Sequence, residues 1–419
     1  MATVVAAEPT PLATAVGSRC GVATRIRRDG TAGGAPPTIG YIPPDVLPPS
    51  EEFDAVPKGM SYQQFAASLR DSDARKRVLR VNGRPFYVLL SQQFARPDIE
   101  QLCDTATAIR RLDRHREGQG FLRGVLAGQR IMHLFAQPST RTAQSFLAGA
   151  DKLGAQSRTV TDLSTSSFAK GESVEDAVRT LSSFFDTIVT RHHENDFATR
   201  AAWALSCSHR PIPVISAGSG RSQHVTQSLL DVYTLRYSFA ERGGIDGKTV
   251  LIIGDIARNR AARSLAYLMT KFSQPRVYFV SPQEHEPDDD LLAYLGKHGI
   301  EVRIHERLDT MLQEHGRQID AIYVTRLQQE WDEGGPPAER GSSDPYILKP
   351  SYRELIRPDC VVMHPLPRVN ELPDEWEEHP GFVVWRQVRN GMWIRAALFA
   401  VVHGADEEIR ARARRLDLL

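Results

Sequence analysis

Short apolar runs alternate with segments of helical periodicity along most of this 419-residue chain. Three such apolar runs lie at 129–136, 186–191 and 212–218. Each of them precedes or follows a stretch whose apolar residues recur at helical spacing, such as 226–243. Strands that alternate with helices in this way form parallel sheets covered by helices on both faces. This alternation therefore restricts the chain to the α/β class.

The alternation breaks once and then resumes. The stretch Gly-Gly-Ile-Asp-Gly at 243–247 is typical of a domain junction. Four further strand-like runs come after it, at 248–255, 276–282, 320–326 and 359–368. We therefore expect an α/β fold of two doubly wound parallel-sheet domains in tandem, at 76–242 and 243–387, with a long terminal helix at 388–405.

The composition excludes several classes of protein. A formal net charge of +1 gives no reason to expect a nucleic-acid or membrane partner. No run reaches the roughly 18 apolar residues of a membrane helix. The four cysteines are scattered without a C-x-x-C pair, which argues against a zinc site or a disulfide framework and favours a reducing compartment. A cytoplasmic location is the simplest expectation.

Residues 1–75 differ from the rest of the chain. The segment is rich in Ala, Thr, Gly and Pro and has no long amphipathic pattern, so we expect a flexible extension. Its first 28 residues hold four arginines and one acid, Glu8. That bias leaves an organellar transit peptide as an alternative to the cytoplasmic location.

The segment Pro-Ser-Thr-Arg-Thr at 138–142 stands where an apolar run gives way to a helix. A helix N-terminus offers unpaired N–H groups and a positive dipole end, which attract phosphate. Ser139, Thr140 and Thr142 add hydroxyl groups, and Arg141 adds a guanidinium suited to oxyanions. The competing interpretation is an ordinary Ser/Thr cap beside a surface arginine.

Five ordered motifs decide between these interpretations. They are STRTAQSF at 139–146, SSFAKGES at 166–173, VTRHH at 189–193, SAGSGRSQHVTQSLLDVYT at 216–234, and HPLPRVNEL at 364–372 with RQVRNGMWIRAALFAVV at 386–402. Together they resemble the aspartate/ornithine carbamoyltransferase family over roughly residues 85–405. The resemblance implies that the terminal helix returns to the first domain and completes it.

The resemblance implies a site for carbamoyl phosphate in the first domain. Its residues would be Ser139, Thr140, Arg141 and Thr142 on the phosphate, Thr142, Arg191 and His224 on the carbonyl oxygen, and Gln227 with the backbone carbonyl of Leu366 on the carbamoyl NH2. Such chemistry rests on positioning and electrostatics, so we expect neither a cofactor nor a metal. No side chain stands out as a general base, and the departing phosphate is the expected proton acceptor.

The second substrate is indicated by polar residues at the ends of two strands in the second domain. The chain lacks the Asp-x-x-x-Ser-Met-Gly signature of the ornithine enzymes and has His-Pro-Leu-Pro in place of their His-Cys-Leu-Pro. Instead Arg260, Arg326 and Gln328 match the aspartate-binding positions of the aspartate enzymes. Two arginine forks suit a dicarboxylate such as L-aspartate, and strand carboxyl ends are where open α/β sheets bind ligands.

The family resemblance also implies a homotrimer. Ser166 and Lys170 lie in a loop that, in the family, enters the active site of a neighbouring subunit, and threefold closure suits such a contact. The competing view is that Lys170 is a solvated surface lysine. The motifs carry no signal for a regulatory chain or a dihydroorotase partner.

Several family positions are altered in this chain. Gln137 stands where an acid often precedes the phosphate motif, Ala143 replaces the second arginine of Ser-Thr-Arg-Thr-Arg, and Trp331 replaces an arginine that pairs with that acid. Val225 and Ala169 are further departures. These changes leave the reacting groups intact but point to a different control of domain closure.

Three functions stay open on the sequence. The first is carbamoyl transfer to aspartate in pyrimidine biosynthesis, and the second is carbamoyl transfer to another amino acid or amine in specialised metabolism. The third is a catalytically inactive regulatory homologue. A dehydrogenase is disfavoured because the strand at 248–255 lacks the G-x-G-x-x-G turn.

Overall fold

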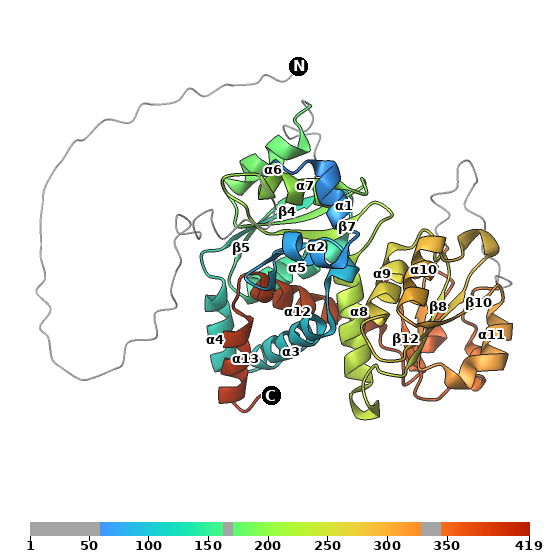
Figure 1. Ribbon diagram of the computed structural model, residues 1–419. Helices are drawn as coiled ribbons and strands as arrows, with labels where there is room; N and C mark the ends of the chain where they lie inside the picture. Colours follow the sequence, from blue (N-terminus) through green and yellow to red (C-terminus); the bar gives the residue numbers. More distant parts are fainter. Residues whose placement is uncertain (1–58, 162–170, 328–344) are drawn as a thin grey trace, which may run out of the picture. The chain divides into compact units, whose positions relative to one another are not determined.

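The computed structural model describes residues 59–161, 171–327 and 345–419. Two five-stranded sheets dominate these residues, and every strand pair in both sheets is parallel. The expected pair of doubly wound α/β domains is therefore confirmed (Figure 1). Within the described ranges, no helix is both long enough and apolar enough to span a bilayer.

The sheet of the first domain has the strand order β3-β7-β6-β4-β5. These strands are β3 (Tyr87–Val88), β4 (Arg130–Phe135), β5 (Gln156–Val160), β6 (Thr187–His192) and β7 (Val214–Ser219). Successive residues of β4 face opposite layers, because side chains alternate along a strand. Ile131 and Phe135 enter one hydrophobic cluster, whereas Met132 and Leu134 enter another.

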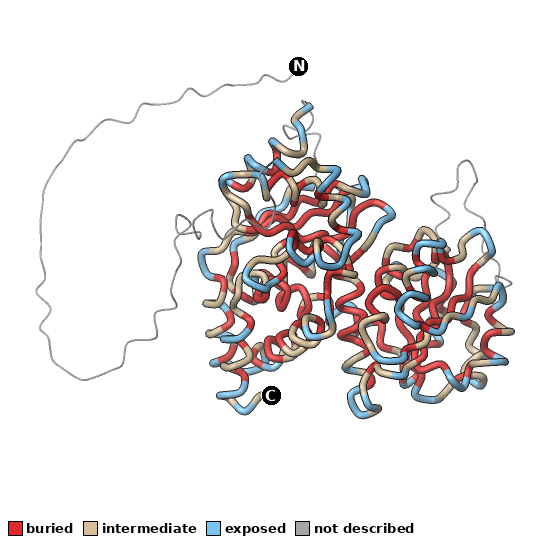
Figure 2. The backbone as a smooth tube through the Cα atoms, viewed as in Figure 1, coloured by how far each residue is buried: buried red, intermediate tan, exposed pale blue. Residues whose placement is uncertain are grey.

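Helices cover both faces of this sheet. The first cluster is formed with α3 (Arg96–Leu112), α5 (Thr140–Lys152), α8 (Val225–Ser238) and α12 (Val384–Val402), and the second with α1 (Tyr62–Ser68), α2 (Ser72–Leu79), α6 (Val174–Ser182) and α7 (Phe197–Ser206). The remaining helices of this domain are α4 (Arg116–Val125) and α13 (Asp406–Arg415). The inner strands β4, β6 and β7 are accordingly almost entirely buried, whereas the edge strand β5 is partly exposed (Figure 2).

The second domain has the strand order β10-β9-β8-β11-β12. Its strands are β8 (Thr249–Ile253), β9 (Arg276–Val280), β10 (Glu301–His305), β11 (Ala321–Val324) and β12 (Val361–Met363), with helices α9 (Arg260–Met269), α10 (Asp289–Lys297) and α11 (Leu308–His315). Val250 and Ile252 of β8 join the same cluster as the first-domain helices. Helices α8 and α9 pack side by side, so one apolar core is continuous across both domains (Figure 1).

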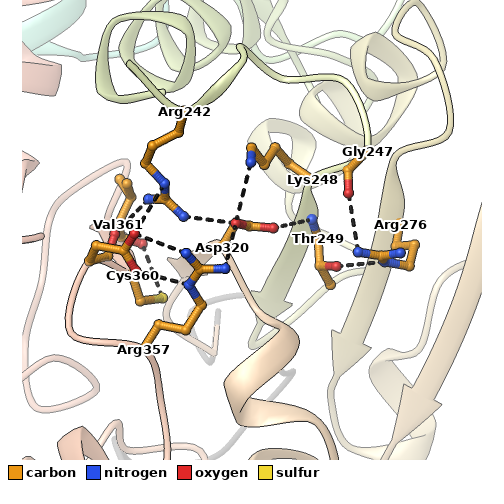
Figure 3. Close-up of polar contacts among 10 residues, drawn as sticks. Arg242, Gly247, Lys248, Thr249, Arg276, Asp320, Arg357, Cys360 and Val361 are labelled. Atoms are coloured by element: carbon orange, nitrogen blue, oxygen red, sulfur yellow. Dashed lines mark hydrogen bonds and ion pairs between the residues drawn. The ribbon is translucent and has the colours of Figure 1, made fainter. Parts of the chain in front are cut away.

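Charged side chains at the amino-terminal ends of the interior strands β8 and β11 hold the chain beside the expected junction at 243–247. Asp320, which precedes β11, accepts hydrogen bonds from Arg242 Nη2 at 2.8 Å and from the Thr249 amide at 3.0 Å (Figure 3). Lys248 Nζ lies 3.8 Å and Arg357 Nη1 3.6 Å from the same carboxylate oxygen. The start of β8 is therefore anchored on a buried acid.

The expectation for the N-terminus is wrong over residues 62–75. Helices α1 and α2 begin within that range, and the α1 side chain of Phe65 is fully buried. Ser61 forms a capping box at α1 and Asp71 caps α2. Such caps stabilise helices too short to show clear periodicity in the sequence. Residues 1–58 of the expected extension lie outside the described residues.

Helix α12 begins at Val384, four residues before the expected position. It packs on α3, α5 and α8 of the first domain, as the resemblance implied for the terminal helix. Gly149 of α5 permits the close approach, since a Cβ there would lie 3.0 Å from the Ala396 amide nitrogen. The last long helix therefore returns to the first sheet after the chain has completed the second.

We expect His133 to make the fold less stable in acid. Burial lowers the pKa of this fully buried imidazole from 6.5 to about 4, so unfolding is accompanied by proton uptake below pH 6.5. The free energy of unfolding should fall as the pH is lowered from 6.5 toward 4. His133→Met should remove up to about 3 kcal/mol of that dependence, measured by urea unfolding across this range.

The exposed His115 provides the matched control. His115→Gln should leave the acid dependence of unfolding as it is in the parent protein. Equal acid dependence in the parent and in His133→Met would contradict the assignment.

Candidate active site

A cavity of about 320 Å³ lies where the carboxyl ends of both sheets meet. The residues that line it include Ser139, Arg141, Thr142, Ser145, Arg191, His224, Gln227, Asn259, Arg260, Arg326, His364, Leu366, Gln387 and Arg395. Five of the lining residues are arginines, and none of those that the structure describes there is Asp or Glu. The cavity is therefore built for anions.

The N-terminus of α5 forms one end of this cavity. Ser139 is the N-cap residue, yet its side chain makes no capping hydrogen bond. Its hydroxyl is not consumed by the helix, so the interpretation of Pro-Ser-Thr-Arg-Thr as an ordinary cap loses its basis. Thr142 is buried at the cavity wall, and burial together with the charge of Arg326 lowers the pKa of Arg141. Thr140 is exposed and does not line the cavity.

Arg191 and His224 come from neighbouring strand ends. The Arg191 guanidinium donates to the Ala217 carbonyl at 3.1 Å and lies 3.5 Å from His224 Nε2. Burial, with the charges of nearby arginines, lowers the pKa of Arg191 to about 9. The same causes hold the pKa of His224 well below its usual value, so this imidazole is neutral near pH 7.

Gly218 provides the space for two of these arginines. The residue has a φ of +111° in β7, and a Cβ on it would lie 3.1 Å from Arg191 Nη1 and 3.3 Å from Arg260 Cζ. Only glycine combines that backbone conformation with no side chain. The two guanidinium groups from different domains are therefore brought against the same bare stretch of backbone.

Arg260 begins α9, directly after its N-cap. The cap is Asn259, whose side chain accepts from the amides of Ala261 and Ala262. The Arg260 guanidinium donates to the Gly220 carbonyl at 2.7 Å and to Gln137 Oε1 at 3.0 Å. Both partners are neutral, and burial lowers the pKa of Arg260 to about 10. Arg326 comes directly after β11 and Thr325, and it lines the same cavity.

Two further predicted residues, Gln227 and Leu366, line the wall between these ends. Gln227 Nε2 donates to Asp231 at 2.9 Å, and the Leu366 amide donates to His364 Nδ1 at 2.8 Å. His364 is itself bonded through Nε2 to Glu371 at 2.9 Å. The Leu366 backbone is thus held in place at a φ of +57°.

The sequence reasoning missed Arg395, His364 and Gln387. Arg395 is 3% exposed, lies 4.9 Å from the centre of the Phe146 ring and donates to Ser145 Oγ at 2.7 Å. Burial lowers its pKa to about 9. The sequence signal for Arg395 is that it is a single arginine inside the otherwise apolar run Trp-Ile-Arg-Ala-Ala-Leu.

The structure brings together the predicted residues Ser139, Arg141, Thr142, Arg191, His224, Gln227, Leu366, Arg260 and Arg326. Three predicted site residues lie outside the described residues, namely Ser166, Lys170 and Gln328. The altered family position Trp331 also lies outside them. The described residues form a two-ended cationic site: α5 and β6 supply one end and the second domain supplies the other.

Comparison with known proteins agrees with this geometry. The model of the aspartate/ornithine carbamoyltransferase carbamoyl-P binding domain matches residues 88–237, and that of the Asp/Orn binding domain matches 246–402. The chain belongs to the aspartate/ornithine carbamoyltransferase family.

Individual relatives lie within the aspartate branch of the family. The chain is 37% identical over 358 residues, 85% of its length and 92% of the relative, to chloroplastic aspartate carbamoyltransferase of Oryza sativa. It is 34% identical to the aspartate carbamoyltransferase catalytic subunit of Cellvibrio japonicus, over 78% of this chain and 95% of that one. Aspartate transcarbamoylase of Trypanosoma cruzi, solved with carbamoyl aspartate and phosphate, has a TM-score of 0.64 at 29% identity, covering 75% and 95% of the two chains.

We expect inorganic phosphate to stabilise the protein through the α5 end of the cavity. A ligand that binds only the folded state raises the free energy of unfolding by about 2.7 kcal/mol at a hundred times its Kd. Arg141→Ala should remove most of the phosphate-dependent rise in melting temperature. Differential scanning fluorimetry at increasing phosphate concentrations measures the melting temperature of the parent protein and of the variant.

Arg303→Gln is the control, because Arg303 lies on β10 and pairs with the exposed Glu301. Its phosphate-dependent shift should equal that of the parent protein. A shift that survives in Arg141→Ala would place the anion elsewhere.

Proposed function

We propose that this protein transfers the carbamoyl group of carbamoyl phosphate to the amine of L-aspartate, giving N-carbamoyl-L-aspartate and phosphate, a step of pyrimidine biosynthesis. The observation that carries the proposal is the two-ended cavity: a phosphate-type site on the first domain faces Arg260 and Arg326 of the second. The relatives named above support it, since they are aspartate carbamoyltransferases.

The donor is held by the first domain. Ser139, Arg141 and Thr142 bind the phosphate, with Thr140 taking part through its backbone amide at the start of α5. Thr142, Arg191 and neutral His224 surround the carbonyl oxygen, where negative charge develops as the amine attacks. Gln227 and the Leu366 carbonyl accept hydrogen bonds from the carbamoyl NH2. Each donor aimed at the developing oxyanion contributes about 3 kcal/mol to lowering the barrier.

The amine needs a proton acceptor once it has attacked the carbonyl carbon. His364 is bonded to Glu371 and Leu366, and His224 is surrounded by arginines that disfavour its protonation. The departing phosphate lies beside the new C–N bond and is the stronger candidate. When the phosphate leaves, it carries that proton away from the carbamoylated product.

The acceptor is held by the second domain. Arg260 and Arg326 bind the two carboxylates of aspartate, together with Gln328 and with Lys170 from a neighbouring subunit. Shared sites of this kind make the protein a homotrimer, with Ser166 and Lys170 entering from the adjacent chain. The first domain, which begins with α1 and is completed by α12, would bind the donor, and the second, from the junction at 243–247 to the start of α12, would bind the acceptor.

A second candidate function keeps the donor chemistry and changes the acceptor amine. It is favoured by Gln137, whose amide oxygen lies 3.0 Å from Arg260 Nη2 where an acid is common in the family. A neutral partner leaves the full charge of Arg260 to the acceptor and alters the shape of that end. An inactive regulatory homologue is disfavoured by the intact cluster of Arg141, Arg191 and His224.

The plant relatives bear on location. Several are named as chloroplastic, which supports an organelle address for residues 1–58 over the simpler cytoplasmic location. The arginine-rich, acid-poor start of the chain has the composition of such a segment.

We expect the purified protein to form N-carbamoyl-L-aspartate, and Arg141→Ala to form none that is detectable. Loss of the phosphate clamp removes both donor binding and its alignment. The product is measured directly with carbamoyl phosphate and a panel of amines that includes L-ornithine. Preference for an amine other than aspartate would establish the second candidate, and turnover of no amine would favour the regulatory homologue.

We expect N-(phosphonacetyl)-L-aspartate, which joins both substrates, to raise the melting temperature more than phosphate does. Arg260→Gln should reduce that rise to the one seen with phosphate alone, because Arg260 is assigned to the aspartate half of the analogue and the phosphonate is held by α5. Arg303→Gln again serves as the matched surface control. No additional rise over phosphate in the parent protein would argue against an aspartate site.

A further inference from the structure

A buried carboxylate stands one helical turn behind the donor site. Asp231 on α8 is fully buried and does not line the cavity, but its partners Gln227 and Gln387 do. Its Oδ1 accepts from Gln227 Nε2 at 2.9 Å and from Gln387 Nε2 at 2.7 Å. Its Oδ2 accepts from Tyr323 Oη at 2.7 Å. Three neutral donors, from α8, α12 and β11, thus converge on one acid.

The Oδ1 atom of this acid sets how both glutamines are oriented. It accepts from each of them, so each glutamine turns its NH2 group toward Asp231 and its oxygen away. The oxygen of Gln387 then accepts from the His364 amide at 3.0 Å. The oxygen of Gln227 is left as an acceptor on a side chain that lines the cavity.

The second glutamine extends the effect to the loop after β12. Gln387 holds the His364 backbone, and His364 Nδ1 holds the Leu366 amide at 2.8 Å. Asp231 therefore reaches the two groups that face the carbamoyl NH2 by separate routes: Gln227 directly, and Leu366 through Gln387 and His364.

We infer that Asp231 is a positioning residue that makes the site selective for a donor bearing an NH2 group, by fixing Gln227 and the Leu366 loop as hydrogen-bond acceptors. The inference rests on the proposed function, in which those two groups bind the carbamoyl NH2. It explains how the site selects its carbamoyl donor, which is separate from how tightly the site binds phosphate.

A buried carboxylic acid at position 231 is unfavourable unless hydrogen-bond donors surround it. Burial raises the pKa of Asp231 to about 7, and the hydrogen bonds from Tyr323, Gln387 and Gln227 oppose that rise, as does the charge of Arg395. A well-packed apolar residue at the same place would not carry this desolvation cost. An apolar residue would also leave the Gln227 amide free to turn over, whereas Gln387 would still be held by the His364 amide.

Asp231→Asn tests the inference, because asparagine has nearly the same shape but brings its own NH2 group. The acceptor that holds the Gln227 NH2 group is then uncharged and weaker, so this NH2 group is free to turn toward the cavity, where it would meet the NH2 of the donor. Acetyl phosphate serves as the probe, since it replaces that NH2 with a methyl group. The preference for carbamoyl phosphate, measured as the Ki of acetyl phosphate over the KM of carbamoyl phosphate, should fall about tenfold. Binding of inorganic phosphate should not change.

Tyr323→Phe is the matched control. It removes the hydrogen bond to Oδ2, one contact of Gln227 and one tie between the domains, but it keeps the carboxylate oxygen that both glutamines face. It should lower thermal stability and keep the parent preference, whereas a purely structural role for Asp231 would make the two variants alike. An unchanged preference in Asp231→Asn would overturn the inference.

A second variant covers the case in which Asp231→Asn does not fold. Gln387→Leu breaks only the route to His364, and it should also lower the preference for carbamoyl phosphate. An unchanged preference there would overturn the role assigned to the loop. A parent protein that does not use carbamoyl phosphate would overturn the proposed function itself, whereas an active parent with unaltered variants would overturn the inference alone.

Discussion

The desolvation of clustered arginines is the constraint on which the site depends. Arg141, Arg191, Arg260, Arg326 and Arg395 line one cavity, and none of its described lining residues is an acid. Burial lowers the pKa of Arg191 and Arg395 to about 9, because the charged form of each guanidinium is disfavoured where little water reaches it. The apolar core that α8, α9 and α12 share stabilises the fold and offsets this cost. An anion in the cavity reduces it further, since arginines from both domains line that cavity.

Much of the site could be predicted because its residues adjoin strand ends in the sequence. Arg191, Arg260 and Arg326 each stand at or after the end of a recognisable parallel strand, and the topology of such sheets places their carboxyl ends on one side. Arg395, Gln387 and His364 were not predicted. Arg395 and Gln387 reach the cavity only because α12 crosses back to the first domain, which no local pattern encodes. His364 directly follows β12 and therefore stands at a strand end, as Arg326 does. Thr140 was predicted among the phosphate ligands, yet the turn of α5 leaves its side chain exposed.

Two of the altered family positions now have physical roles. Gln137 accepts a hydrogen bond from Arg260, so the arginine keeps an ordered geometry while its charge stays unneutralised. Ala143 is partly buried and packs on the first hydrophobic cluster, which α3, α5, α8 and α12 form with the sheet.

The short helices at 62–79 could not be predicted from periodicity in the sequence. Their stability comes from caps and from Phe65 buried against the first domain, and neither produces a long periodic signal.

The return of α12 has a consequence for biosynthesis. The strands of both sheets are complete by residue 363, but Gln387 and Arg395 come later in the chain, on α12. During synthesis every strand is therefore made before the cavity has all of its lining residues. The cationic cluster gains its fifth arginine only with α12. A chain interrupted before α12 would carry every motif that marks strand ends and still lack the wall that joins them.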